Sequence, residues 1–286
     1  MKKLISLLLA AFTVSSLAAA FAVPTGAVDA PEIKNAASAY LYNIENSQAI
    51  YTYNPEEKVY PTSTVKIMTG IVALEALGDR LDEKVTITSE MLSEVSGNNV
   101  KLTVGEQVTV KDLLGAMLVY GANDAAYALA YTVAGSSRDF VQMMNDKAAS
   151  LAMTGTHFAN PHGLHDENHY TTAYDVYLML YAAYQHTEFQ NTMSMSSYTL
   201  NMTHADGTAG TIYLSSTDKY LTGEKNAPEN VTVLGGKTGT TDEAGSCLAL
   251  VSQNAYGEPF ISVILHASTK VELYEDMNTL LSNINS

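Results

Sequence analysis

The sequence predicts an α+β fold in which an antiparallel sheet is flanked by helices and carries an inserted, mostly helical subdomain. Two observations lead to this prediction. Runs rich in β-branched and aromatic residues lie near both ends of the chain, whereas capped segments with helical periodicity fill its middle. This order implies one sheet assembled from distant segments, with helices inserted between them. The 286 residues, of which 47% are hydrophobic, suffice for a sizeable core.

The expected strands lie in two groups. Near the N-terminus, two runs at 39–44 and 49–53 flank a polar link at 45–48, which is typical of a hairpin. Three strand-like runs and a closing helix follow near the C-terminus, at 231–236, 246–251, 260–265 and 271–281.

Helices are predicted where apolar residues recur at helical spacing. The first begins near Ser63 and ends near Leu77, before Gly78. Another is expected after Asn123. Three further starts show a hydroxyl residue followed three positions later by Asp, similar to a capping box: Thr109 with Asp112, Ser136 with Asp139, and Thr172 with Asp175.

The N-terminus has the order of a secretory signal peptide. Lys2 and Lys3 precede a long uncharged stretch that ends in small residues. We expect residues 1–22 to be a signal peptide, 23–37 a leader, and 38–286 one folded domain. An uncleaved membrane anchor is the alternative, because the uncharged stretch is nearly long enough to span a bilayer.

Charge excludes several partners. A formal net charge of −15 argues against nucleic acid and against a polybasic membrane contact. We expect no membrane anchor after signal cleavage, since no later segment is long and apolar, and the closing helix is acidic. Cys247 is the only cysteine, so no intramolecular disulfide can form, and we expect it to be buried.

A candidate nucleophile lies at the start of the first helix. Ser63 and Lys66 are three residues apart and so share one helix face, where a neutral lysine can accept the serine proton. Losing its charge requires the lysine to be buried or close to another cation. A capped helix with a surface lysine is the alternative interpretation.

Two further elements complete a possible site. Lys237-Thr238-Gly239-Thr240 follows a predicted strand and offers a cation, a hydroxyl and an open backbone edge to a peptide that bears a carboxylate. An ordinary turn is its alternative. Asn123 offers an amide that can contact both lysine and substrate, although an N-cap for the next helix is the simpler reading of this residue.

The three elements, in this order, resemble the motifs of the penicillin-binding serine peptidases, which are Ser-x-x-Lys, Ser-x-Asn and Lys-Thr-Gly. The chain is most similar to the low-molecular-mass D-alanyl-D-alanine carboxypeptidases, from about Ser38 to Leu281. Supporting stretches are residues 60–69, 160–164 and 236–241. The resemblance implies a β-lactamase/transpeptidase-like fold, with residues 38–286 as the serine peptidase catalytic domain.

The resemblance also implies roles for individual residues. Ser63 would attack the carbonyl between two terminal D-alanines, Lys66 would take its proton, and Asn123 would complete the catalytic set. The backbone N–H groups of Ser63 and Thr240 would form the oxyanion hole. Lys237, Thr238, Gly239 and Thr240 would bind a peptidoglycan stem peptide ending in D-Ala-D-Ala. β-Lactams would acylate the same serine.

One position departs from the family pattern. Gly121 stands where the second motif has serine, whose hydroxyl is thought to pass a proton to the leaving group. We therefore expect an active but slower enzyme. The alternatives that stay open are a D,D-endopeptidase that cuts peptide crosslinks and a non-catalytic penicillin-binding protein. A β-lactamase is disfavoured, because no Glu-x-x-Leu-Asn stretch lies between Asn123 and Lys237.

Four histidines lie close together in the sequence, at His157, His162, His165 and His169. Imidazole is a common zinc ligand. Their irregular spacing and the absence of a completing carboxylate or thiolate pattern favour a loop beside the cleft instead. We expect no metal and no cofactor.

Overall fold

A computed structural model describes residues 32–285 of the chain. The predicted signal peptide and most of the predicted leader lie outside these residues. The end of the leader packs against the domain, because Ile33 is buried and the Asn35 N–H donates to the Asp276 carboxylate at 3.0 Å. The folded part of the chain therefore starts a few residues before Ser38.

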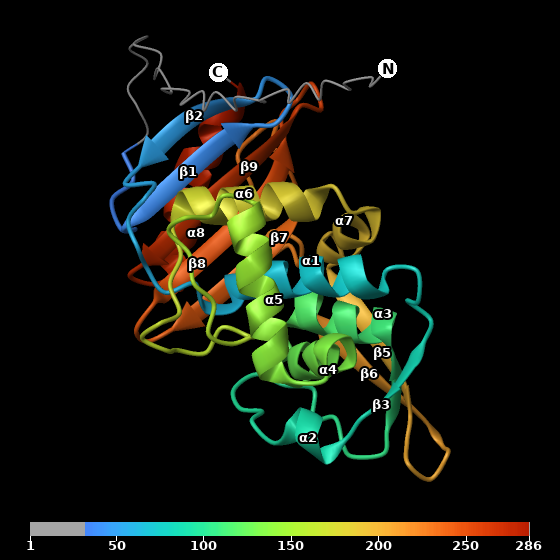
Figure 1. Ribbon diagram of the computed structural model, residues 1–286. Helices are drawn as coiled ribbons and strands as arrows, with labels where there is room; N and C mark the ends of the chain where they lie inside the picture. The colour runs from blue at the N-terminus through green and yellow to red at the C-terminus, as the bar shows by residue number, and fades with distance from the viewer. Residues whose placement is uncertain (1–31, 286) are drawn as a thin grey trace, which may run out of the picture.

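A five-stranded antiparallel sheet joins the two ends of the described chain (Figure 1). Its order is β2-β1-β9-β8-β7, so the predicted N-terminal hairpin and the three C-terminal strands form one sheet. The bounds are β1 Ser38–Asn43, β2 Gln48–Tyr53, β7 Thr232–Thr241, β8 Gly245–Gln253 and β9 Pro259–Ala267. The end strand β7 leaves one edge open beside the helical region.

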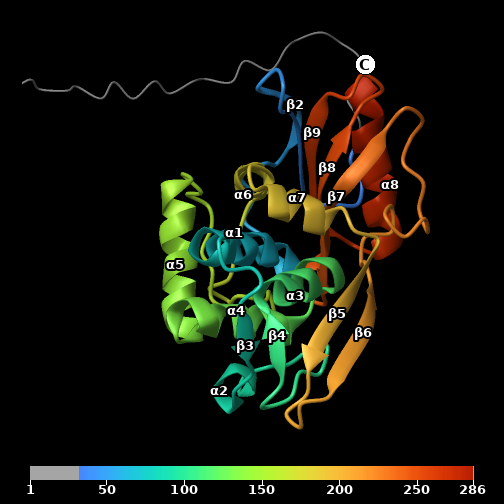
Figure 2. The same ribbon diagram turned by 90° about the vertical axis from the view of Figure 1, so that its right-hand side faces the viewer.

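Helices cover both faces of this sheet. The closing helix α8, Lys270–Leu281, packs on one face, and α6, Ala173–Tyr184, packs on the other (Figure 2). The central strands β8 and β9 are buried along almost their whole length, because residues of either parity meet a helix. This explains why both strands read as nearly continuous apolar runs.

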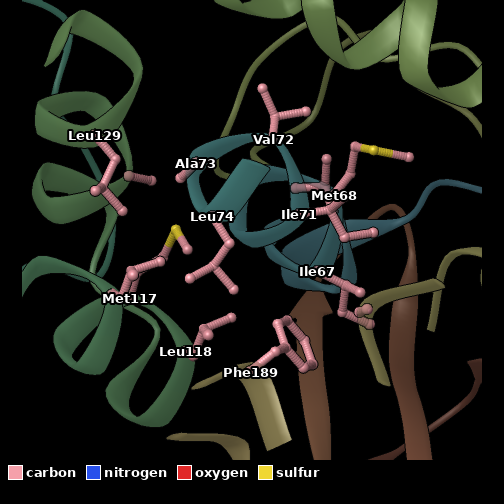
Figure 3. Packing of buried hydrophobic residues seen from close by; sticks show 14 of the residues in the cluster. Ile67, Met68, Ile71, Val72, Ala73, Leu74, Met117, Leu118, Leu129 and Phe189 are labelled. Atoms are coloured by element: carbon pink, nitrogen blue, oxygen red, sulfur yellow. The ribbon is translucent and has the colours of Figure 1, made fainter. Parts of the chain in front are cut away.

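The helical region is built around α1, Lys66–Leu77, which continues a short 3-10 turn at Thr62–Val65. Apolar side chains surround α1, and Ile67, Leu74, Leu118 and Phe189 lie together in this core (Figure 3). The other helices are α2 Ser89–Leu92, α3 Val110–Gly115, a π-helical turn at Ala116–Tyr120, α4 Asn123–Ala134, α5 Ser137–Ser150, α7 Thr187–Met193 and a final 3-10 turn at Ser282–Asn285.

The predicted helix starts are confirmed. The hydroxyls of Thr109, Ser136 and Thr172 accept from the backbone N–H of the Asp three residues later. Within residues 32–285, none of the helices is both long enough and apolar enough to span a bilayer.

The prediction of a single sheet was wrong. A second antiparallel sheet, in the order β3-β4-β5-β6, packs beside α3 at the lower right of Figure 1. Its strands are β3 Lys84–Thr86, β4 Gln107–Thr109, β5 Ser197–Thr203 and β6 Ala209–Ser215. β3 and β4 are too short to give a strand pattern. β5 and β6 are rich in hydroxyl residues, although Asp206-Gly207 between them is a hairpin signal. The fold class itself is confirmed.

Candidate active site

Ser63 lies in the 3-10 turn before α1, where strand β7 passes very close to the chain. A Cβ built on Gly239 would lie 1.7 Å from Thr62 Oγ1 and 2.7 Å from the backbone N of Ser63. Only glycine leaves room for this approach. The Lys-Thr-Gly motif thus does more than supply side chains, since its glycine brings β7 against the turn that carries Ser63.

Lys66 is fully buried at the first residue of α1, and its Nζ faces the serine. This nitrogen donates to Ser63 Oγ at 3.0 Å, to Asn123 Oδ1 at 2.8 Å and to the carbonyl of His162. Burial holds the pKa of Lys66 well below its usual value. The charge of Lys237 lowers the pKa further, and Asp124 opposes both. This lysine is therefore suited to accept a proton from Ser63.

Asn123 does not cap α4, so the simpler reading of this residue was wrong. It is the first residue of the helix, and its side chain points into the site instead. Its Nδ2 donates to the Ser96 carbonyl at 2.7 Å, which fixes Oδ1 toward Lys66. Asp124 holds the same loop, because its carboxylate accepts the backbone N–H groups of Val100 and Leu102.

Gly121 ends the π-helical turn with a φ of +87°, a conformation that favours glycine. A Cβ at this position would have ordinary contacts, 3.5 Å from Asn98 Nδ2 and 3.6 Å from Lys237 Nζ. The position therefore faces the site with space for a side chain, but the backbone conformation disfavours one.

The Lys-Thr-Gly motif lies inside β7 rather than after it, because the strand continues to Thr241. Lys237 is 3% exposed, and its Nζ contacts Thr217 Oγ1 at 3.4 Å and the Thr238 carbonyl at 3.2 Å. Burial lowers the pKa of Lys237 to about 8, and Asp218 opposes this shift. The Thr238 hydroxyl donates to Thr217 Oγ1 at 2.6 Å.

These residues border one open cleft of about 540 Å³. Ser63, Gly121 and Lys237 to Thr240 line it, together with residues of the loop after β6. Lys66 and Asn123 lie buried behind the serine. The structure thus brings all seven predicted site residues to one place: Ser63, Lys66, Asn123, Lys237, Thr238, Gly239 and Thr240.

Two contributors were not predicted individually. The His162 carbonyl binds Lys66, but every residue type has a backbone carbonyl, so the sequence does not indicate this contact. Thr217 lies in a loop without a motif, and only its packing against β7 reveals it.

The four histidines do not converge on a metal site. His162 Nε2 hydrogen bonds to Tyr127 Oη at 2.9 Å, and His157 Nδ1 contacts the Asn168 carbonyl. His169 is buried, and its two ring nitrogens have no hydrogen-bond partner in the described part of the chain. Among residues 32–285, no group of three or more His, Cys, Asp or Glu is placed to hold a metal ion.

Comparisons with known proteins agree on one family. A family model described as D-alanyl-D-alanine carboxypeptidase matches residues 25–269. D-alanyl-D-alanine carboxypeptidase DacF of Bacillus subtilis is 32% identical over 98% of this chain and 70% of its own length. A D-alanyl-D-alanine endopeptidase of Pseudomonas aeruginosa is 30% identical over 85% of this chain and 75% of its own.

A solved structure agrees with these matches. The crystal structure of a Streptomyces DD-transpeptidase superposes with a TM-score of 0.81 at 26% identity, covering 89% of this chain and 98% of that one. Its similarity extends over nearly all of the fold described above.

Proposed function

The chain belongs to the D-alanyl-D-alanine carboxypeptidase family of penicillin-binding serine peptidases, and from this premise we propose that Ser63 is its acyl-carrying nucleophile. The substrate is a peptidoglycan stem peptide ending in D-Ala-D-Ala. The enzyme hydrolyses the last peptide bond and releases one D-alanine. The observation that carries this proposal is the fully buried Lys66, whose Nζ lies 3.0 Å from Ser63 Oγ.

Acylation begins with transfer of the Ser63 proton to neutral Lys66. Asn123 and the His162 carbonyl fix the position of Nζ, so the lysine needs no rearrangement to act as the base. Ser63 Oγ then attacks the carbonyl carbon of the penultimate D-alanine. The negative charge on the carbonyl oxygen is stabilised by the backbone N–H groups of Ser63 and Thr240, two residues that line the same cleft.

Lys237 and Thr238 bind the carboxylate of the terminal D-alanine. The open edge of β7 supports this role, because a peptide in extended form can add to it as a further strand. Lys237 supplies the charge, and the Thr238 hydroxyl lies beside it in the same cleft. A free carboxylate at this point gives the enzyme its preference for the end of a peptide.

The tetrahedral intermediate collapses when the nitrogen of the terminal D-alanine takes up a proton and leaves. Gly121 provides no hydroxyl for this transfer, so the proton comes from Lys66 through water or through the substrate itself. Water then hydrolyses the ester on Ser63 with Lys66 again as base, and the peptide ending in one D-alanine departs. A β-lactam forms the same ester by opening its ring, without a leaving group that can diffuse away.

A D,D-endopeptidase is the second candidate. The Pseudomonas relative bears this name, and the same residues can cleave either bond. A cleft of about 540 Å³ that is open to solvent also leaves space for a branched substrate.

We further infer export of the enzyme to the cell wall. The N-terminal charge and uncharged stretch support cleavage after a signal peptide of about residues 1–22, which leaves residues 38–286 as the catalytic domain after a short leader. N-terminal sequencing of the protein recovered from culture medium or cell wall tests this. Protein that starts at Met1 would contradict it.

The function is tested by supplying the purified protein with an N-acetylated peptide ending in Lys-D-Ala-D-Ala and, separately, with a crosslinked peptide dimer. We expect D-alanine release from the first, and loss of that release in Ser63→Ala. Ser215→Ala is the matched control, because Ser215 lines the same cleft without a role in the mechanism. Cleavage of the dimer without D-alanine release would establish the endopeptidase instead.

A further inference from the structure

Asp218 is a buried carboxylate that the reaction, as described so far, does not use. It lies in the loop between β6 and β7 and is 1% exposed. Its Oδ1 accepts the backbone N–H of Tyr220 at 3.0 Å, whereas its buried Oδ2 has no hydrogen-bond partner among residues 32–285. An asparagine could accept the same hydrogen bond, so local structure alone does not explain a charge at this position.

The loop that holds Asp218 also forms one wall of the cleft. Ser216 and Thr217 line the cleft, and the Asp218 N–H donates to Ser216 Oγ at 3.1 Å. The Thr217 hydroxyl contacts both Lys237 Nζ and Thr238 Oγ1. Asp218 is therefore attached directly to the residue that bridges the two side chains of the motif.

Lys237 has no carboxylate in direct contact in the described part of the chain. No carboxylate between residues 32 and 285 comes within 4.0 Å of its Nζ, and the atoms it contacts are the uncharged oxygens of Thr217 and Thr238. A buried ammonium without an opposite charge tends to lose its proton. Asp218 is the carboxylate whose charge opposes this tendency.

We propose that Asp218 is a positioning residue that keeps Lys237 protonated in the empty cleft, so that a cation is ready when the substrate carboxylate arrives. This inference rests on the proposed role of Lys237. It gives the buried carboxylate a function that a neutral isostere cannot perform.

The pKa shifts of Asp218 and Lys237 determine the direction in which loss of Asp218 moves the titration of Lys237. Burial raises the pKa of Asp218 to about 6, and Lys237 opposes that shift; burial lowers the pKa of Lys237 to about 8. Between these values both groups are charged. Above the upper value Lys237 loses its proton, and without Asp218 this loss moves to lower pH.

Other titratable groups border the same region. These are Lys66, Lys219, Glu224, Lys270, Tyr120, Tyr220 and Tyr274. Lys66 is held toward its neutral form, the last two tyrosines have raised pKa values, and Lys219 is paired with Glu224 at 3.5 Å. Lys270 is a further cation that lines the cleft.

The test is the alkaline limb of kcat/KM for D-alanine release, measured from pH 6 to 10 in wild type, Asp218→Asn and Asp218→Ser. This limb reports groups of the free enzyme. In both variants we expect it to move about one pH unit toward acid, which gives about a fivefold loss at pH 8 and little change at pH 6. Two neutral replacements of different size separate the charge from its packing.

Asp276→Asn is the matched control, since Asp276 is also buried but accepts the backbone N–H groups of Lys34 and Asn35 and does not line the cleft. Its limb should coincide with that of wild type. Coincident limbs in wild type and both Asp218 variants would overturn the inference, and so would an equal shift in Asp276→Asn.

Wild-type D-alanine release tests the proposed function separately. If it were absent, the pH dependence of penicillin acylation would report the same limb, because penicillin also carries a carboxylate.

Discussion

Two buried lysines border the same cleft and are prepared for opposite tasks. Lys66 is 0% exposed and Lys237 is 3% exposed, so burial disfavours the charge of both. Lys66 donates only to uncharged oxygens and has a cation, Lys237, nearby. Lys237 has Asp218 to oppose its loss of a proton.

The difference shows that residue type and burial do not decide the role of a lysine here. What differs is the net effect of nearby charges, because Lys237 lowers the pKa of Lys66 more than Asp124 raises it, whereas Asp218 raises the pKa of Lys237. A protonated Lys237 adds to the effect of burial in lowering the pKa of Lys66. In the proposed mechanism one lysine therefore acts as the base and the other as the anion-binding group.

The largest effect is expected from removing the base. Lys66→Met keeps an unbranched side chain that is one heavy atom shorter and cannot accept a proton, so penicillin acylation should fall by about 10³-fold or more. Stopped-flow or timed intact-mass measurements give the rate. Lys219→Met changes another lysine of the same cleft and should stay near wild type. Acylation of Lys66→Met within tenfold of wild type would remove Lys66 from the role of base.

A smaller loss of kcat/KM, about 10²-fold, is expected when Lys237 is replaced by a neutral residue. In Lys237→Gln the loss should fall on substrates with a free terminal carboxylate and should nearly vanish for the same peptide with an amidated C-terminus. The ratio of kcat/KM values for the two peptides measures this directly, with Lys219→Gln as control. An unchanged ratio would mean that the carboxylate binds elsewhere.

The charge environment of Lys66 can be made similar to that of Lys237 by placing a carboxylate in direct contact with it. Asn123→Asp places a carboxylate oxygen at the position that now lies 2.8 Å from Lys66 Nζ, so the pKa of Lys66 should rise. At pH 7 we expect the activity of Asn123→Asp to be about tenfold or more below wild type, and to recover partly as the pH increases. Asn123→Ala removes the contact without adding charge, and its loss should not recover. Parallel pH profiles for the two variants would contradict this explanation.

The smallest change is expected at Gly121. Gly121→Ser adds the hydroxyl that the family motif has, next to Lys237, and should raise kcat severalfold if proton delivery to the leaving group limits turnover. A φ of +87° should make any side chain destabilising, by about 1 kcal/mol or more. Gly121→Ala carries the same cost without a hydroxyl. Equal kcat values for these two variants would show that the hydroxyl has no role.

Local patterns in the sequence were sufficient for much of the fold. The capping residues Thr109, Ser136 and Thr172 start helices through contacts only three residues away, so a short window contains the whole signal. The second sheet was missed because β3 and β4 have three residues each. β3 pairs with β4, and β4 in turn pairs with β5, almost a hundred residues later. Pairing of this kind depends on tertiary contacts.

The same distinction applies to the active site. Ser63, Lys66 and Lys237 were recognisable because the chemistry requires those side chains at fixed spacing. The His162 carbonyl was not, since any residue supplies a carbonyl oxygen. Asp218 belongs to no motif, and its proximity to the cleft follows only from the path of the loop between the two sheets.

The most direct test of the account is intact-mass spectrometry of the mature protein after exposure to a penicillin, followed by peptide mapping of the adduct. The account predicts one added penicillin mass on wild type, carried by the peptide that contains Ser63. It predicts no adduct on Ser63→Ala and an unchanged adduct on Ser215→Ala. An adduct that persists in Ser63→Ala, or a wild-type protein that forms none, would contradict the claim that Ser63 is the nucleophile.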